Sequence, residues 1–131
     1  MLFLKWMKIF LIVEILNKGH LINALFLYDH SGITISMSPF SCSWDSGQVG
    51  YVYMTKEDII ENWGTGDDAY EKAKKCMEGE VETYDDYITG QVYGFRIEGP
   101  NEEELDSCWG YYGDHGKESM IDECKKTIDH Y

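Results

Sequence analysis

The chain has few basic residues, no paired-cysteine motif and no phosphate-binding loop, and each absence removes a class of function. Eleven lysines and arginines stand against 24 aspartates and glutamates in 131 residues, giving a formal net charge of −13. Such a field repels nucleic-acid phosphates, so we expect no direct binding of DNA or RNA. The four cysteines form no CxxC pair, which excludes a zinc ribbon and a thioredoxin motif. No Walker A sequence is present, which excludes nucleotide binding through that loop.

The chain also lacks a hydrophobic run long enough to span a membrane. Met1 to Leu16 is strongly apolar, but Glu14 interrupts it and no small-residue cleavage site follows. The run is shorter than the ~20 residues that a spanning helix needs. We therefore predict an apolar helix over residues 1–17 that faces the core, with a membrane anchor as the alternative.

The composition is that of a folded protein with an acidic surface. Hydrophobic residues make up 44% of the chain and aromatic residues 15%, which is too apolar for a disordered acidic segment. A chain of 131 residues suits one domain that folds without disulfides. We predict a single domain, with the helix over 1–17, an α+β core over 18–113 and a C-terminal helix over 114–131.

Hydrophobic periodicity predicts the elements of that core. Strands are expected over residues 20–28, 33–38, 48–54, 91–98 and 104–112, with helices from Lys56 to about Trp63, from Asp67 to Gly90 and from about Lys117. Thr55 and Asp58 have the spacing of a capping box at the first of these helices. Short loops between consecutive strands favour antiparallel pairing. We therefore predict one antiparallel sheet of about five strands, with helices mainly on one face.

The densest group of reactive side chains surrounds the turn between the first two strands. Asp29 and His30 lie in that turn, and Cys42 and Asp45 follow in the next loop. Zinc accepts imidazole, thiolate and carboxylate ligands, so these four residues, joined by Cys108 from a later strand, form a candidate zinc site. Their spacing has no specificity. The alternative is a polar turn held by hydrogen bonds beside a buried Cys42.

A third interpretation of the same residues is a hydrolase in which Cys42 is the nucleophile and His30 its base. The sequence has neither a nucleophile elbow nor a cysteine-protease signature. We therefore expect that the chain is not an enzyme.

A second candidate site is electrostatic. Between Asp67 and Asp106 the chain has thirteen acidic residues and four basic ones. Carboxylates three or four residues apart on the long helix form a negative stripe, and three more follow in the later turn and strand. The predicted partner-binding residues are Glu78, Glu82, Asp85, Asp86, Glu102, Glu103 and Glu104. A solvated helix face is the alternative.

Four strings of residues resemble a known family: LYDHSGITIS (27–36), PFSCSWDSGQVGY (39–51), EVETYDDYITGQVYGF (80–95) and DSCWGYYG (106–113). They are similar to small proteins encoded by phages, prophages and mobile elements of Gram-positive bacteria, over about residues 18–113. The resemblance implies an accessory protein of the host cytoplasm. Small acidic phage proteins include anti-CRISPR proteins that bind Cas9 and DNA mimics that occupy restriction enzymes.

Together, charge and resemblance lead us to expect a counter-defence inhibitor. It would be an anti-CRISPR protein that binds a type II effector, Cas9, through its acidic surface and impedes nucleic-acid loading. The alternative is a small zinc-containing interaction protein whose partner is a restriction enzyme or another defence enzyme.

Overall fold

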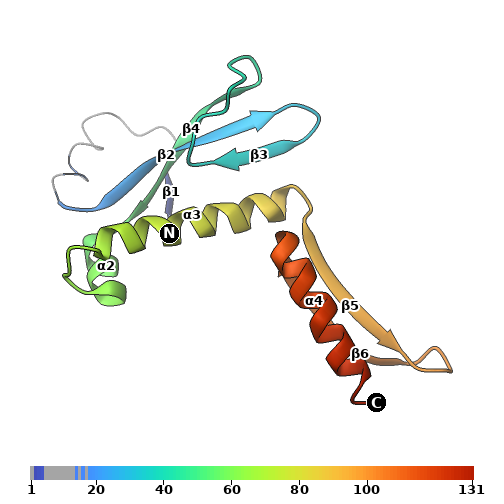
Figure 1. Cartoon of the computed structure of the whole chain (residues 1–131). Coiled ribbons are helices and arrows are strands. Elements are labelled where there is room, and N and C mark those ends of the chain that lie inside the picture. The colour runs from blue at the N-terminus through green and yellow to red at the C-terminus, as the bar shows by residue number, and fades with distance from the viewer. Residues whose placement is uncertain (1, 5–13, 15, 17) are drawn as a thin grey trace. The chain divides into compact units, whose positions relative to one another are not determined.

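The computed structural model describes residues 2–4, 14, 16 and 18–131, and the chain divides into two compact units, residues 1–85 and 86–131 (Figure 1). Each unit is described by itself. The α+β class predicted from the sequence is confirmed, because each unit combines antiparallel strands with helix.

The first unit contains a four-stranded antiparallel sheet with the strand order β1-β4-β2-β3. Its elements are β1 (Leu2–Leu4), β2 (Leu21–Asp29), β3 (Ile33–Ser36), β4 (Ser46–Met54), α2 (Lys56–Trp63) and most of α3 (Ala69–Ile88). The hairpin predicted from the alternating apolar residues is confirmed by the pairing of β2 with β3, for example Leu27 with Ile35.

The prediction of an apolar helix over residues 1–17 is wrong at its start. Leu2–Leu4 forms a strand that pairs with β4, with Leu2 opposite Tyr53 and Leu4 opposite Tyr51. A short apolar run does not distinguish a buried helix from a strand by periodicity alone, and here the edge of β4 supplies hydrogen-bond partners that the sequence does not reveal. Most of the remaining segment lies outside the described residues.

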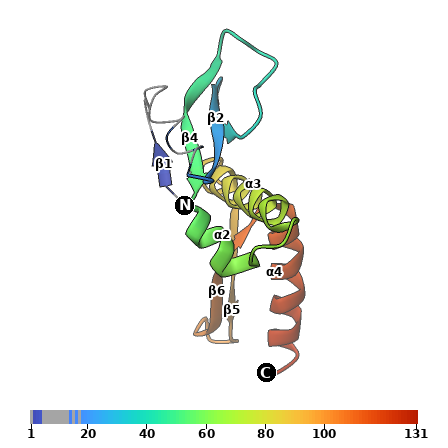
Figure 2. The same ribbon diagram turned by 90° about the vertical axis from the view of Figure 1, so that its left-hand side faces the viewer.

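Helix α3 covers the first sheet with a narrow apolar stripe. Ala69, Ala73, Met77 and Val81 recur every four residues and are all buried. They share a core with Leu25, Ile35, Val52 and Met54 of the sheet and with Ile59 of α2. Figure 1 shows the helix lengthwise below the strands of this sheet, and Figure 2 views it closer to end-on. Met77 is the largest side chain of this stripe and is fully buried, so it fills most of the apolar space on this face of the helix.

Helix α2 begins as the sequence predicts. The Thr55 hydroxyl accepts a hydrogen bond from the Asp58 backbone N–H at 3.1 Å, which satisfies one of the donors that a helix leaves unpaired at its start. His20 provides a second cap, because its Nδ1 accepts from the backbone N–H of Lys56 at 2.8 Å. The Tyr70 hydroxyl donates to the Gly19 carbonyl, so the start of β2 is fixed to both helices.

The second unit is a hairpin covered by a helix. Strand β5 (Val92–Glu98) pairs with β6 (Glu104–Tyr112), and α4 (Gly113–Ile128) follows directly and packs against both strands. Gly113 starts this helix with a φ of 64°, a left-handed conformation that favours glycine. The helix begins four residues before the predicted start at Lys117, because a single glycine makes the turn from strand to helix.

The prediction of one sheet with about five strands is therefore wrong in its connectivity. The strands form two separate sheets, one of four strands and one of two. The sequence pattern locates strands but does not choose their partners. Helix α3 has 20 residues and is roughly 30 Å long. A connection of this length allows the next strand, β5, to pair with β6 and not with the first sheet.

Candidate functional site

The loop around His30 is a compact polar turn at the end of the β2–β3 hairpin. The backbone N–H of Asp29 donates to the carbonyl of Asp45 at 2.8 Å, and that of His30 donates to the carbonyl of Gly32 at 3.1 Å. Ser31 has a φ of 59°, in the left-handed region that tight turns require. These bonds hold the turn against the loop that precedes β4.

Three of the predicted zinc ligands meet at the carboxylate of Asp45. His30 Nδ1 lies 3.0 Å from Asp45 Oδ2, and the Cys42 thiol lies 3.9 Å from the same oxygen. Asp29 contacts Asp45 through a backbone hydrogen bond and not through its carboxylate. The Asp45 carboxylate thus accepts a hydrogen bond from the Cys42 thiol and lies in ion-pair range of His30, while Cys42 is half-buried and not fully buried as the polar-turn alternative expects.

Aromatic side chains brace the same loop. The ring of Tyr28 lies 6.1 Å from the imidazole of His30 and 5.6 Å from the ring of Phe40, measured between centroids. Trp44, by contrast, is 95% exposed. A packed Tyr28 fixes the loop, and an exposed tryptophan beside it is available for contact with a partner.

The fifth predicted ligand, Cys108, lies on β6 in the second unit, where the Tyr111 hydroxyl donates to its sulfur at 3.5 Å. Within the described part of the chain, no three His, Cys, Asp or Glu side chains are arranged to hold a metal ion. His30, Cys42 and Asp45 nevertheless lie together, and zinc binding by these residues stays a prediction. The Cys42 thiol contacts Asp45, whereas a cysteine nucleophile needs a base such as His30 beside its sulfur.

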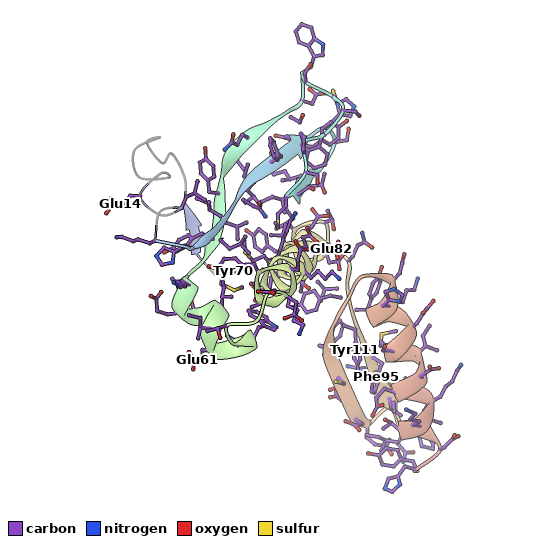
Figure 3. All side chains as sticks on the ribbon, turned by 60° about the vertical axis from the view of Figure 1, so that its left-hand side comes forward. Glu14, Glu61, Tyr70, Glu82, Phe95 and Tyr111 are labelled. Carbon is purple, nitrogen blue, oxygen red and sulfur yellow. The ribbon has the colours of Figure 1, made fainter. Side chains whose placement is uncertain are left out.

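The predicted acidic stripe on α3 contains residues with different roles. Glu78 and Glu82 are exposed (Figure 3 labels Glu82). Asp85 is engaged within the first unit, because one of its oxygens accepts hydrogen bonds from the Thr34 hydroxyl at 2.6 Å and from the Ile35 backbone N–H at 2.7 Å. Asp85 therefore anchors the edge strand β3 to the end of α3.

Asp86, the next residue, belongs to the second unit. A Cβ atom placed on Gly113 would lie 2.6 Å from Asp86 Oδ2, so this carboxylate lies directly against the first residue of α4. A carboxylate at a helix N-terminus is stabilised by the partial positive charge there. Asp86 thus lies where its charge stabilises the start of α4, and its predicted docking role stays a prediction.

The remaining predicted docking residues are Glu102 and Glu103 in the exposed turn between β5 and β6, and Glu104 at the start of β6. Glu102 has a φ of 63°, and Glu103 accepts a hydrogen bond from the backbone N–H of Asn101 at 2.9 Å. Glu104 is bonded by the Ser107 hydroxyl at 2.8 Å and lies 3.8 Å from Arg96. All three glutamates are exposed, and they place a concentrated negative charge at the tip of the hairpin.

The second unit is both the more acidic of the two and poor in buried apolar residues. Its 46 residues include eleven acidic and four basic side chains, a net charge of −7, whereas the 85 residues of the first unit have a net charge of −6. Phe95 and Ile97 are its buried hydrophobic side chains, while Trp109 is 71% exposed and Tyr112 and Tyr131 are also exposed. Exposed aromatics within a negative field are typical of a protein-binding surface.

A groove of about 420 Å³ lies between the β5–β6 hairpin and α4 (Figure 3). Its lining residues are Phe95, Asp106, Ser107, Cys108, Tyr111, Ser119, Glu123 and Thr127. The hydrogen bond to Cys108 is the largest cause that raises the pKa of Tyr111 to about 12, and partial desolvation and the charges of Cys108, Glu123 and Cys124 raise it further. The phenol is therefore protonated throughout the physiological range.

Sequence reasoning missed this groove, although one signal for it was present. Ser119, Glu123 and Thr127 recur every four residues and form a polar stripe on α4. Such a stripe on the face toward a hairpin indicates a polar cleft, but that conclusion requires knowing where α4 begins and which strands it covers.

No helix among the described residues is long and apolar enough to cross a membrane. Comparison of the chain with protein-family models, with curated proteins and with solved structures gave no match.

Proposed function

We propose that the chain is a non-enzymatic inhibitor that docks the acidic surface of residues 86–131 on the basic nucleic-acid-binding groove of a host defence nuclease. The observation that carries this proposal is the coincidence, in one small unit, of a net charge of −7 with exposed Trp109, Tyr112 and Tyr131. Tryptophan and tyrosine supply most of the binding energy in many interfaces, and complementary charge speeds the encounter.

The charged residues that support this docking are Glu102, Glu103 and Glu104 at the hairpin tip, with Glu78 and Glu82 of α3 as a second exposed group. Nucleic-acid-binding grooves are lined with Lys and Arg, whose charges are neutralised by phosphates when the nucleic acid is bound. A protein that presents carboxylates competes for those residues and so impedes loading of the nucleic acid.

The first target to test is a type II CRISPR effector, Cas9, because the family resemblance described above points to phage accessory proteins of Gram-positive hosts. A restriction enzyme or another defence nuclease is the alternative target. Both present basic grooves, so the same surface serves in either case.

The test is capture of purified Cas9, with and without guide RNA, by the immobilised chain at about 50 mM and about 500 mM salt, because exposed charges are screened at the higher concentration. We expect binding that weakens at least tenfold at high salt. The variant Glu102→Gln/Glu103→Gln/Glu104→Gln should bind more weakly than the charge-matched control Glu61→Gln/Glu71→Gln/Glu80→Gln, whose positions are exposed in the first unit. Equal binding by both variants, or no dependence on salt, would contradict the proposal.

A zinc-containing interaction protein is the second candidate, and the meeting of His30, Cys42 and Asp45 at one carboxylate favours it. The test is metal analysis of protein purified without a histidine tag. One zinc per chain that is lost in Cys42→Ser would support this candidate, whereas a stoichiometry near zero would remove it.

A further inference from the structure

We infer that the groove between the β5–β6 hairpin and α4 binds the guanidinium group of an arginine side chain. The inference rests on the proposed function for the source of that arginine, a basic partner protein, but the groove lies wholly within residues 86–131 and can be tested on the chain alone.

The floor of the groove is aromatic. Phe95 is 9% exposed, and its ring lies 6.4 Å from that of Tyr111, with 35° between the two planes. Tyr111 remains a neutral phenol whose hydrogen is donated to Cys108. A guanidinium is planar and weakly hydrated, and it stacks on the faces of such rings more favourably than an ammonium group does.

Two carboxylates from different elements line the groove. Asp106 comes from β6 and Glu123 from α4. The recorded contact of Asp106 is with the neighbouring Ser107 backbone N–H, and the ion pair of Glu123 with Lys126 is long, at 3.9 Å. Both carboxylates therefore retain lone pairs that can accept N–H donors from a ligand.

Hydroxyl groups complete the set of acceptors. Ser107, Ser119 and Thr127 lie along the rim, and Thr127 donates its own hydrogen to the Glu123 carbonyl at 2.9 Å. No Lys, Arg or His belongs to the lining of this groove in the fully described second unit. The groove is thus negative, rich in hydrogen-bond acceptors and lined by two aromatic rings.

Other occupants fit these features less well. A divalent cation needs several oxygen or nitrogen ligands around one point, and the described residues form no such cluster. A phosphate or carboxylate ligand would meet two carboxylates. A lysine ammonium would satisfy the charge but would leave the aromatic rings and the hydroxyl acceptors without a matching planar donor.

The test is a titration of the full chain, observed by amide NMR, with N-acetyl-arginine amide, with its neutral isostere N-acetyl-citrulline amide and with N-acetyl-lysine amide. We expect the arginine probe to shift the amides of Cys108, Ser119, Glu123 and Thr127 in a saturable manner. The citrulline probe should bind at least tenfold more weakly because it lacks the charge. Lysine binding as tight as arginine binding would overturn the inference, because it would show a site that recognises charge alone.

Matched variants locate the site. The variant Asp106→Asn/Glu123→Gln should weaken arginine binding about tenfold or more, because it removes the charge from both carboxylates that accept hydrogen bonds from the guanidinium. The control Asp114→Asn/Asp122→Asn removes the same charge from exposed positions of α4 outside the groove and should bind as the parent chain does. Equal losses in the two variants would contradict a defined site. If the groove fails this test while the hairpin-tip variant still loses the partner, the docking proposal survives without the groove.

Discussion

Two adjacent aspartates at the end of α3 make intramolecular contacts that their charge and spacing in the sequence do not indicate. Asp85 accepts two hydrogen bonds from β3, and Asp86 lies against the start of α4. The sequence placed both in a docking stripe because they are acidic and correctly spaced. Their contacts within the folded structure lie about 50 and 27 residues away along the chain, so the local sequence does not reveal them, and a docking role for either carboxylate stays a prediction.

Replacing Asp85 by alanine should destabilise the first unit. The variant loses hydrogen bonds from the Thr34 hydroxyl and the Ile35 N–H to a charged acceptor, a loss of about 1.5–3 kcal/mol in the free energy of unfolding. Chemical denaturation measures the change. Glu82→Ala, three residues earlier on an exposed position, is the control and should alter stability by less than about 0.5 kcal/mol. Equal stability of the two variants would show that Asp85 does not anchor β3.

Tyr111 should ionise only at strongly alkaline pH, since its pKa is raised to about 12. A folded-state pKa above the unfolded value of about 10 means that the protonated phenol contributes its full stability below pH 10. That contribution is lost as the pH rises from about 10 toward 12. The ultraviolet absorbance of tyrosinate follows the titration.

Cysteine variants separate the causes of this raised pKa. In Cys108→Ala the Tyr111 phenol loses the hydrogen bond that is the main cause, so its pKa should fall toward the ordinary value. Cys42→Ala changes a thiol in the first unit and should leave the titration unchanged. A Tyr111 that still ionises late in Cys108→Ala would show that partial desolvation is the larger cause.

At the scale of the elements, two glycines inside helices differ in the space around them: one lies on an exposed face and the other on a packed face. Gly79 of α3 has open space where a Cβ would be placed, so Gly79→Ala should stabilise the chain by about 0.5–1 kcal/mol through helix propensity. A Cβ on Gly116 of α4 would lie 2.8 Å from the backbone carbon of Tyr111. Gly116→Ala should therefore displace the helix from β6 and destabilise the chain by about 1–3 kcal/mol.

Thermal unfolding of these two alanine variants gives opposite signs if α4 packs on β6 as described. Stabilisation by both substitutions would mean that the contact at Gly116 is loose. The groove test adds an independent readout, because a displaced α4 moves Ser119 and Glu123 away from the hairpin and should weaken the arginine probe in Gly116→Ala but not in Gly79→Ala.

The elements themselves were largely predictable from the sequence, because their signals are local. The capping residues Thr55 and Asp58, the alternation through Ile33 and Ile35, and the helical spacing after Asp67 each identify an element within a few residues. The division of the strands between two sheets was not predictable in this way. Strand pairing is decided by contacts between distant residues. The length of α3 does not indicate which strand β5 pairs with.

For the whole molecule, the unequal cores of the two units predict unequal stability. The described residues of the first unit include nine buried apolar side chains, whereas the second unit has two, Phe95 and Ile97. Because local opening is easiest where few apolar contacts are broken, the amides of β5 and β6 should exchange with deuterium at least tenfold faster than those of β2 and β4. Mass spectrometry or NMR measures this difference, and equal protection of the two sheets would contradict it.

If residues 86–131 dock on a partner as proposed, a unit with so small a core should be stabilised by that partner. Addition of a ligand that binds the folded form stabilises that form by mass action. In a complex with its target, the exchange of β5 and β6 should therefore slow more than that of β2 and β4. This readout reports which unit makes the contact, independently of any variant.

The contact of Asp85 with Ile35 also bears on self-association. Strand β3 is an edge of its sheet, and the Ile35 N–H that faces away from β2 is a donor through which a strand of a second molecule could add. Asp85 already occupies that donor and places a charge beside it. A chain without this carboxylate would be prone to grow into edge-to-edge aggregates, so Asp85 protects solubility at high concentration as well as the fold.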